Sequence, residues 1–137
     1  MFPASTNGGG VCNSYPDVCK VPAPTGPPIP TPFPNVGQCT DAKGSTCSSK
    51  VKILNKKTFT KKTELSRSSG DEAGTLGGMV SGTNMDKVKR SASYAKVKCE
   101  GAEITTSLKA TGHNGSNANA PPGSQLSPSQ DKVVCMG

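Results

Sequence analysis

The sequence predicts a small all-β protein, and three observations lead to that prediction. The 137 residues include 16 glycines and 12 prolines, and this share of about a fifth favours turns and extended segments over helices. No segment shows the spacing of an amphipathic helix, and a short alternating motif that is typical of strands occurs three times. Leu, Ile, Val and Phe together number only 21, so strand pairing, turns, a metal or disulfides are expected to supplement a small core.

The chain length is that of a single domain, which we expect to span residues 1–137. Residues 1–15 are small and polar, with three consecutive glycines that a helix would not tolerate. Residues 16–37 are rich in proline, and residues 38–137 carry the repeated motif and glycine-rich loops. We therefore expect a polar N-terminal segment, a proline-rich strap and a region of β repeats, in that order.

The proline-rich segment holds eight prolines between Pro16 and Pro34. Proline fixes φ and removes a backbone donor, so the segment is expected to be extended, in a polyproline II form. The segment also contains the apolar residues Val21, Ile29 and Phe33, which we expect to pack against another part of the protein. We expect an ordered strap around the domain, and the alternative is a flexible linker or a ligand for a proline-binding domain.

The repeated motif reads KVKILN at 50–55, KVKCEG at 96–101 and KVVCMG at 132–137. The valine and the Ile or Cys that follows it lie two residues apart, so they should share one face of a strand. This spacing predicts that Val51, Val97 and Val133 point inward, and the closing Asn or Gly suits a turn with positive φ. Three copies predict three equivalent β elements around an axis, unless so short a motif recurs by chance.

The second variable position of the motif holds Ile53 in one copy and a cysteine, Cys99 or Cys135, in the other two. Cysteine behaves as a small apolar side chain when it is buried. We therefore expect both cysteines to be packing residues. Cys39 and Cys47 flank the turn TDAKGST, where a bridge could form if the protein meets an oxidant.

Catalytic chemistry finds little support in the sequence. His113 is the one histidine, and no cysteine lies at a clear helix N-terminus that would lower its pKa. Asp71 and Glu72 are adjacent in the sequence and are expected to be solvated surface groups. The glycine-rich stretches lack the Gly-Lys-Ser/Thr ending of a phosphate-binding loop. We therefore expect a protein that is not an enzyme.

Metal binding is the better chemical candidate. Zinc takes three or four Cys or His ligands, and Cys12 and Cys19 flank the turn-like segment NSYPDV, while His113 lies in a Gly-His-Asn-Gly turn that could expose its imidazole. The six residues between the two cysteines are more than zinc knuckles have. The candidate metal ligands are Cys19, His113 and Cys12.

The chain is basic, with 16 Lys and Arg against 9 Asp and Glu and a net charge of +7. Five of these cations surround one aromatic residue, Phe59, which is too few aromatics for a nucleic-acid stacking platform. A docking surface for an acidic protein fits better. The N-terminus shows neither a basic nor an apolar region of a signal peptide, so we expect the protein to begin in the cytoplasm.

Several motifs, taken in order, resemble those of the PAAR-like proteins in their short single-domain form. They are CNSYPDVCKVPAP, PIPTPFPNVGQC, KVKIL, SGDEAG, VSG, KVKCEG, GHNGSNANAPPG and SPSQDKVV. The resemblance implies a small cone of short β-hairpins with pseudo-threefold symmetry. It also implies a structural role at the spike tip of type VI secretion or related contractile injection systems, where one copy caps the trimeric β-helix of a VgrG-type protein.

The same resemblance implies further properties. The tip would sharpen the spike for puncturing a membrane that it contacts only transiently, would recruit an effector or adaptor, and would leave the bacterium on the spike without a signal peptide. A metal in this family is held by histidines and a cysteine, and Cys19 and His113 match two of these positions. Asn35 stands where the family has another histidine, so Cys12 or another thiol would complete a zinc site. The alternative function is a small cytoplasmic thiol-rich module that binds metal or nucleic acid.

Overall fold

The computed structural model describes residues 2–135, and these residues form an all-β fold with two short 3₁₀ turns. No helix in this range is long and apolar enough to cross a membrane. The strands are β1 (Phe2–Pro3), β2 (Val11–Val21), β3 (Ile29–Gln38), β4 (Lys52–Ile53), β5 (Lys56–Lys57), β6 (Glu64–Leu65), β7 (Val88–Arg90), β8 (Tyr94–Cys99), β9 (Ala102–Ile104), β10 (Ala110–His113), β11 (Ala120–Ser127) and β12 (Val134–Cys135), with 3₁₀ turns η1 (Cys39–Asp41) and η2 (Gly44–Thr46). The predicted fold class is confirmed.

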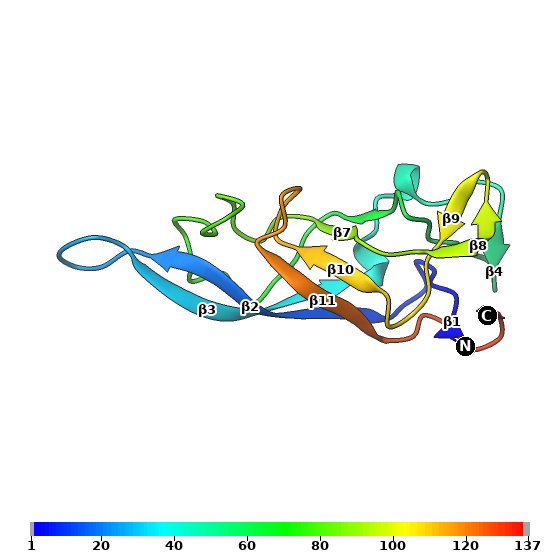
Figure 1. The fold of residues 1–137 in the computed structure, drawn as a ribbon, viewed down its shortest axis with the longest axis horizontal. Coiled ribbons are helices and arrows are strands. Elements are labelled where there is room, and N and C mark those ends of the chain that lie inside the picture. Colours follow the sequence, from blue (N-terminus) through cyan, green and yellow to red (C-terminus); the bar gives the residue numbers. More distant parts are fainter. Residues whose placement is uncertain (1, 136–137) are drawn as a thin grey trace.

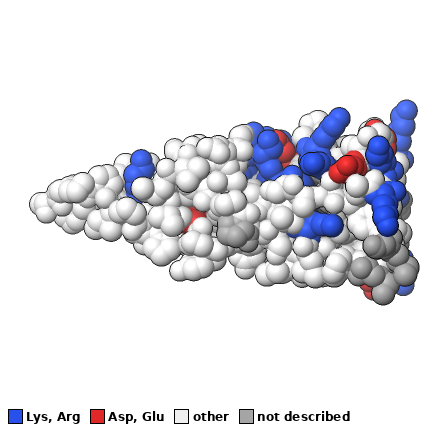
Figure 2. Space-filling model, viewed as in Figure 1, with Lys and Arg blue, Asp and Glu red and all other residues white. Residues whose placement is uncertain are grey.

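A six-stranded sheet in the order β3-β2-β11-β10-β7-β6 runs along the molecule. Figure 1 shows that the molecule is elongated and tapers toward the loop that joins β2 to β3. Both chain ends lie at the opposite, blunt end (Figure 1). The space-filling view has the outline of a cone with its point at the β2–β3 hairpin (Figure 2).

Three two-stranded sheets, β1–β12, β4–β5 and β8–β9, accompany the long sheet, and each contains one copy of the repeated motif. In two of them, the strands are joined by two residues with positive φ: Leu54 and Asn55 at 51° and 64°, and Glu100 and Gly101 at 53° and 83°. This is the geometry of a type I′ hairpin turn, which confirms the expected role of the closing Asn and Gly. Gly137, in the third copy, lies outside the described residues.

A closed ring of backbone hydrogen bonds relates the three sheets. The Phe59 N–H donates to the Ser5 carbonyl at 2.9 Å, the Ser5 N–H donates to Thr105 at 2.9 Å, and the Thr105 N–H donates to Phe59 at 3.3 Å. Three further hydrogen bonds flank this ring, each two residues away from it along both paired segments: they run from the Asn7 N–H to Lys57, from Lys61 to Glu103 and from Ser107 to Pro3. One chain therefore builds three equivalent strands around a pseudo-threefold axis.

The inward placement of the three valines is wrong. Val51, Val97 and Val133 are 41%, 38% and 44% exposed. β4 and β12 contain only two residues each and begin directly after Val51 and Val133. The alternation of side chains along a strand therefore does not include these two valines. In β8 the register shifts between Tyr94 and Lys98, which breaks the alternation around Val97.

The other half of the motif behaves as predicted. Ile53, Cys99 and Cys135 are buried, with exposed fractions of 9%, 4% and 6%. Ile53 and Cys135 pack with Ala4 and Ile104 in one small core cluster. The expected burial of the two cysteines is confirmed. The second core cluster holds Cys12, Cys39, Cys47, Phe59, Leu65 and Val88.

The proline-rich segment is ordered and extended, but it does not wrap the domain. It forms most of the β2–β3 hairpin, whose strands pair in antiparallel register from Val11 opposite Gln38 to Val21 opposite Ile29. On its other side β2 is paired with a loop, because the Lys20 N–H donates to the Gly77 carbonyl at 2.9 Å and the Met79 N–H donates to Val18 at 2.9 Å. The segment is therefore the narrow end of the cone.

Two prolines of β3, Pro30 and Pro32, face away from β2. They lie opposite Lys20 and Val18, whose backbone groups are used by the loop around Gly77. Antiparallel strands alternate between residues that bond to the partner and residues that face the other way. The free edge of β3 at these positions therefore presents carbonyl groups and no N–H donors.

Candidate metal centre

Three potential metal ligands meet inside the β2–β3 hairpin: Asp17, Cys19 and Asp71. Asp17 and Cys19 lie two residues apart on β2, so their side chains share one face of the strand. Asp71 comes from the loop after β6. The Cys19 Sγ lies 3.6 Å from Asp17 Oδ1 and 3.8 Å from Asp71 Oδ2. One ligand atom from each residue lies within 4.8 Å of the others, and all three side chains are fully buried.

The space around this cluster is tight on the side of the 71–83 loop. A Cβ at position 74 would lie 2.3 Å from the Cys19 Cβ, and one at position 78 would lie 2.3 Å from the Asn119 Cγ. Gly74 and Gly78 therefore let the loop approach β2 closely enough to bring Asp71 to Cys19. This is a local reason for the glycine-rich composition of the loop.

Asp17 is held by side-chain amides. Its Oδ2 accepts a hydrogen bond from Asn35 Nδ2 at 2.8 Å. Its Oδ1 accepts hydrogen bonds from Asn114 Nδ2 at 3.3 Å and from Asn119 Nδ2. These three neutral donors fix the orientation of the carboxylate but bring no positive charge to it.

The carboxylate of Asp71 has fewer hydrogen-bond donors than that of Asp17. Its Oδ2 accepts a hydrogen bond from the Met85 N–H at 3.1 Å, whereas its Oδ1 is buried without a hydrogen-bond partner. Burial, together with the neighbouring Asp17, raises the pKa of Asp71 to about 6. Burial and the two carboxylates raise the pKa of the Cys19 thiol to about 12.

The residues present fit a divalent cation. Two buried carboxylates lie beside a thiol, and one carboxylate oxygen lacks a partner, which is costly unless a positive charge compensates. A cation would satisfy the free Asp71 oxygen and lower the pKa of the Cys19 thiol. One sulfur and two carboxylate oxygens are ligands that Zn²⁺ accepts. In the part of the chain that the structure describes, no other group of three such ligands occurs.

The structure separates the three predicted ligands. Cys19 lies in the cluster, but Cys12 lies in the core beside Cys39 and Phe59. Cys12 and Cys19 belong to one long strand, so the segment between them is not the expected turn. His113 is fully buried, which corrects the expectation of an exposed imidazole.

His113 contacts the cluster through Asn35. Its Nδ1 lies 2.7 Å from Asn35 Oδ1 and its Nε2 lies 3.0 Å from Thr111 Oγ1. Since Asn35 uses its amide nitrogen for Asp17, its oxygen accepts from Nδ1–H, and Nε2 then accepts from the Thr111 hydroxyl. Burial lowers the pKa of His113 to about 4. Both ring nitrogens are therefore engaged in a neutral imidazole.

Sequence reasoning missed Asp17 and Asp71. Asp71 is fully buried, so its assignment to the solvated surface is wrong. The signal for Asp17 was its position two residues before Cys19, which in a strand puts both side chains on one face. The signal for Asp71 was weaker, because its place depends on a loop that folds back over the sheet.

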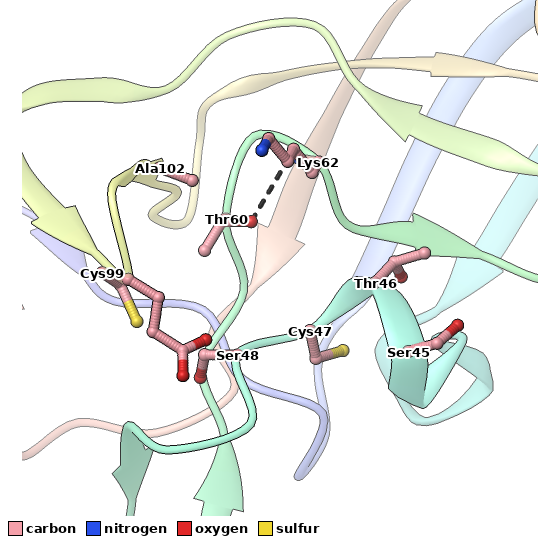
Figure 3. Close-up of a pocket in the computed structure, with 9 residues that line it drawn as sticks. Ser45, Thr46, Cys47, Ser48, Thr60, Lys62, Cys99 and Ala102 are labelled. Carbon is pink, nitrogen blue, oxygen red and sulfur yellow. Dashed lines mark hydrogen bonds between the residues drawn. The ribbon is translucent and has the colours of Figure 1, made fainter.

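A cavity of about 340 Å³ lies near the blunt end, between the η2 segment and the β8–β9 hairpin (Figure 3). Its lining is mostly polar and includes Cys47, Ser48, Thr60, Lys62, Cys99 and Glu100. The Glu100 carboxylate accepts hydrogen bonds from the Ser49 and Lys50 N–H groups at 3.0 and 2.8 Å. This acid therefore joins two segments of the wall.

The cone, its internal threefold relation and the buried carboxylate–thiol cluster define a small β-cone domain. A family model described as the toxin PAAR-like domain matches residues 10–120. The chain belongs to this family. No curated protein and no solved structure matches the chain.

Proposed function

We propose that this protein caps the end of a trimeric β-helical spike of the VgrG type, in a type VI secretion or related contractile injection system. Its function in this proposal is a protein–protein contact and not a catalysed reaction. The observation that carries the proposal is the hydrogen-bonded ring of Ser5, Phe59 and Thr105. A single chain with this arrangement offers three similar faces to three identical chains.

The blunt end has the surface that such a contact needs. Val51, Val97 and Val133 repeat an exposed apolar side chain once in each third of the pseudo-symmetric unit. The end of a trimeric β-helix has three strand edges and an open apolar core, which favour covering by a matching surface. Three equivalent valines fit three equivalent positions on such an end.

The distribution of charge also supports a contact through the blunt end. Figure 2 shows Lys and Arg gathered over the blunt half of the cone, while the narrow half is almost free of charge. Lys50, Lys96 and Lys132 precede the three valines. A basic rim steers association toward an acidic partner and makes the rate depend on salt. The narrow β2–β3 hairpin would then point away from the spike and enter the target membrane first.

The metal of this proposal is Zn²⁺, held by Asp17, Cys19 and Asp71. Its support is the unpartnered Asp71 oxygen and the absence of a cation among the described side chains that contact the two carboxylates. A bound ion would tie β2 to the 71–83 loop and stiffen the hairpin. Cytoplasmic synthesis, export on the spike and recruitment of an effector or adaptor stay predictions from the family resemblance.

Native mass spectrometry with a purified trimeric spike protein tests the cap. We expect one copy of this chain for each trimer. Val97→Asp should abolish the complex, while Val80→Asp should not. Val80 is a matched control because it is 59% exposed and lies on the 71–83 loop, which pairs with β2 at the narrow hairpin through Gly77 and Met79.

Two outcomes would contradict the cap. One is a complex with two or three copies per trimer, and the other is full binding by the folded Val97→Asp variant. Binding to DNA or RNA in place of the spike would favour the alternative of a nucleic-acid-binding module. Phe59 is fully buried, so that module would lack its aromatic platform.

A further inference from the structure

Arg90, on β7, is a buried cation with an unusual environment. It is 5% exposed, and no carboxylate of the described residues lies within ion-pair distance of it. Its guanidinium carbon lies 4.9 Å from the centroid of the Phe59 ring, and its Nη1 is buried without a hydrogen-bond partner. A buried guanidinium remains charged, so it needs an anion nearby.

The nearest anionic candidate is a thiol. Arg90 Nη2 donates to the Cys39 Sγ at 3.6 Å, and Cys12 and Cys39 belong to the same buried core cluster. The hydrogen bond from Cys12 and the charge of Arg90 lower the pKa of Cys39 to about 7 against the effect of burial. The same hydrogen bond, together with burial, raises the pKa of Cys12. Cys39 is therefore the thiolate of the pair and Cys12 is its proton donor.

Strand pairing brings the two cysteines together. Cys12 lies opposite Gly37 in the β2–β3 register, and the Cys39 N–H donates to the Gly10 carbonyl at 3.0 Å. Cys12 thus lies opposite Gly37, which is two residues before Cys39. Cys39 lies opposite Gly10, which is two residues before Cys12. Residues two apart on a strand point to the same face, so the two thiols form a diagonal pair.

The cover of this pair is a short irregular segment. A Cβ at position 10 would lie 2.7 Å from the Ser127 carbonyl and 3.1 Å from the Ser129 Oγ, and Ser129 is among the groups that lower the pKa of Cys39. Pro128 is exposed and follows the last residue of β11. A local opening of residues 127–129 would give a small molecule access to these buried sulfurs.

We propose that Cys12 and Cys39 are a redox site that forms a reversible disulfide in the presence of a disulfide oxidant. The Cys39 thiolate attacks one sulfur of the oxidant, which releases one thiolate and leaves a mixed disulfide on Cys39. Cys12 gives up its proton and attacks the Cys39 Sγ, which releases the second thiolate. From this state the protein loses two electrons and the Cys12 proton, and the two released thiolates take up that proton and one from solvent to become two thiols.

Arg90 sets the conditions under which this bond forms. Oxidation removes the anionic sulfur and leaves the guanidinium buried without a counter-ion, which disfavours the disulfide. The pair therefore stays reduced in a thiol-rich compartment and oxidises in an oxidising one. Once formed, the bond joins the start of β2 to the end of β3 at the root of the narrow hairpin.

Intact-mass spectrometry of the folded chain after incubation with oxidised glutathione tests the site. We expect a product that is two hydrogen atoms lighter and that dithiothreitol reverses. Under non-reducing conditions, trypsin should release peptide 1–20 joined to peptide 21–43. Cys12→Ala and Cys39→Ala should each abolish this product. Cys19→Ala should retain it, which distinguishes the two cysteines of the first peptide.

Arg90→Met supplies a second measurement that does not remove a thiol. In a glutathione redox buffer, its disulfide should be favoured about tenfold or more over that of wild type, because no buried cation loses its partner. Three results would overturn the proposal: a folded chain that stays fully reduced while the unfolded chain oxidises, a bond between Cys39 and Cys47, or an unchanged equilibrium in Arg90→Met.

Discussion

The Nδ1 of His113 lies 2.7 Å from the Asn35 Oδ1, and this contact makes the histidine a positioning residue for the carboxylate cluster. Asn35 in turn orients Asp17, since the Asn35 Nδ2 donates a hydrogen bond to the Asp17 carboxylate at 2.8 Å. Thr111 fixes the other side of the imidazole at 3.0 Å. The buried path from Thr111 to Asp17 therefore orients a potential ligand without using the histidine as one.

The titration of His113 is the first prediction. Burial lowers the pKa of His113 to about 4, so its ring should stay neutral, with the proton on Nδ1, at every pH above that value. The chain has one histidine, so a ¹⁵N NMR titration reports this residue without overlap. Stability from this group is present above the unfolded pKa of about 6.5 and is lost as the pH falls toward 4. A midpoint near 6.5 in the folded protein would contradict the buried tautomer.

The second prediction concerns Asp71 in protein treated with a chelator. Burial raises the pKa of Asp71 in the folded protein to about 6, above the usual aspartate pKa of about 3.9, so the stability that its protonated form provides is lost as the pH rises from about 4 to about 6. Asp71→Asn should therefore stabilise the metal-free protein by about 2–3 kcal/mol at pH 7 and leave it unchanged below pH 4. Urea unfolding at the two pH values measures this difference, and equal stability at pH 7 would count against it.

Metal content is the third prediction. Elemental analysis should find about one zinc per chain in wild type and none in Cys19→Ser or Asp71→Asn. His113→Gln should still bind, with affinity reduced about 10- to 100-fold, because an outer partner and not a ligand is removed. Chelator should lower the melting temperature of wild type and of His113→Gln, but not that of Cys19→Ser or Asp71→Asn. Full loss of zinc in His113→Gln with retention in Asp71→Asn would reverse the assignment.

The fourth prediction compares two neighbours on β8. Val97 is 38% exposed and Cys99 is 4% exposed. Val97→Asp should change the free energy of unfolding by less than about 1 kcal/mol. Cys99→Asp should cost several kcal/mol, since it buries a charge without a partner. Thermal unfolding of both variants separates the two positions, and equal destabilisation would show that Val97 packs inward after all.

Sequence alone predicted the repeat and its closing turn, because both depend on local chemistry. Asn55 and Gly101 tolerate positive φ wherever they occur. The exposure of the valine side chains was not predicted. Side chains alternate between faces only along a continuous strand, and the strand at Lys52–Ile53 is two residues long. The register shift in β8 depends on its partner strand, which the motif does not contain.

The residues of the candidate metal centre divide in the same way between those that the sequence indicates and those that it does not. Cys19 was found through its motif, and Asp17 follows from the alternation of β2 around it. Asp71 reaches the site through a loop closure that depends on Gly74 and Gly78 lying against β2. Asn35 was discounted as a poor ligand, yet its two amide atoms connect His113 to Asp17. Tertiary contacts of this kind are not encoded by spacing.

Because Pro30 and Pro32 face outward, the free edge of β3 at the narrow end can accept hydrogen bonds at these two positions but cannot donate them. A strand added to this edge would find acceptors but no donors, so copies of the protein cannot assemble into a continuous sheet through it. The same edge would enter an apolar phase without the desolvation cost of free N–H groups at these two residues. Proline thus makes the hairpin both resistant to aggregation and less costly to move out of water.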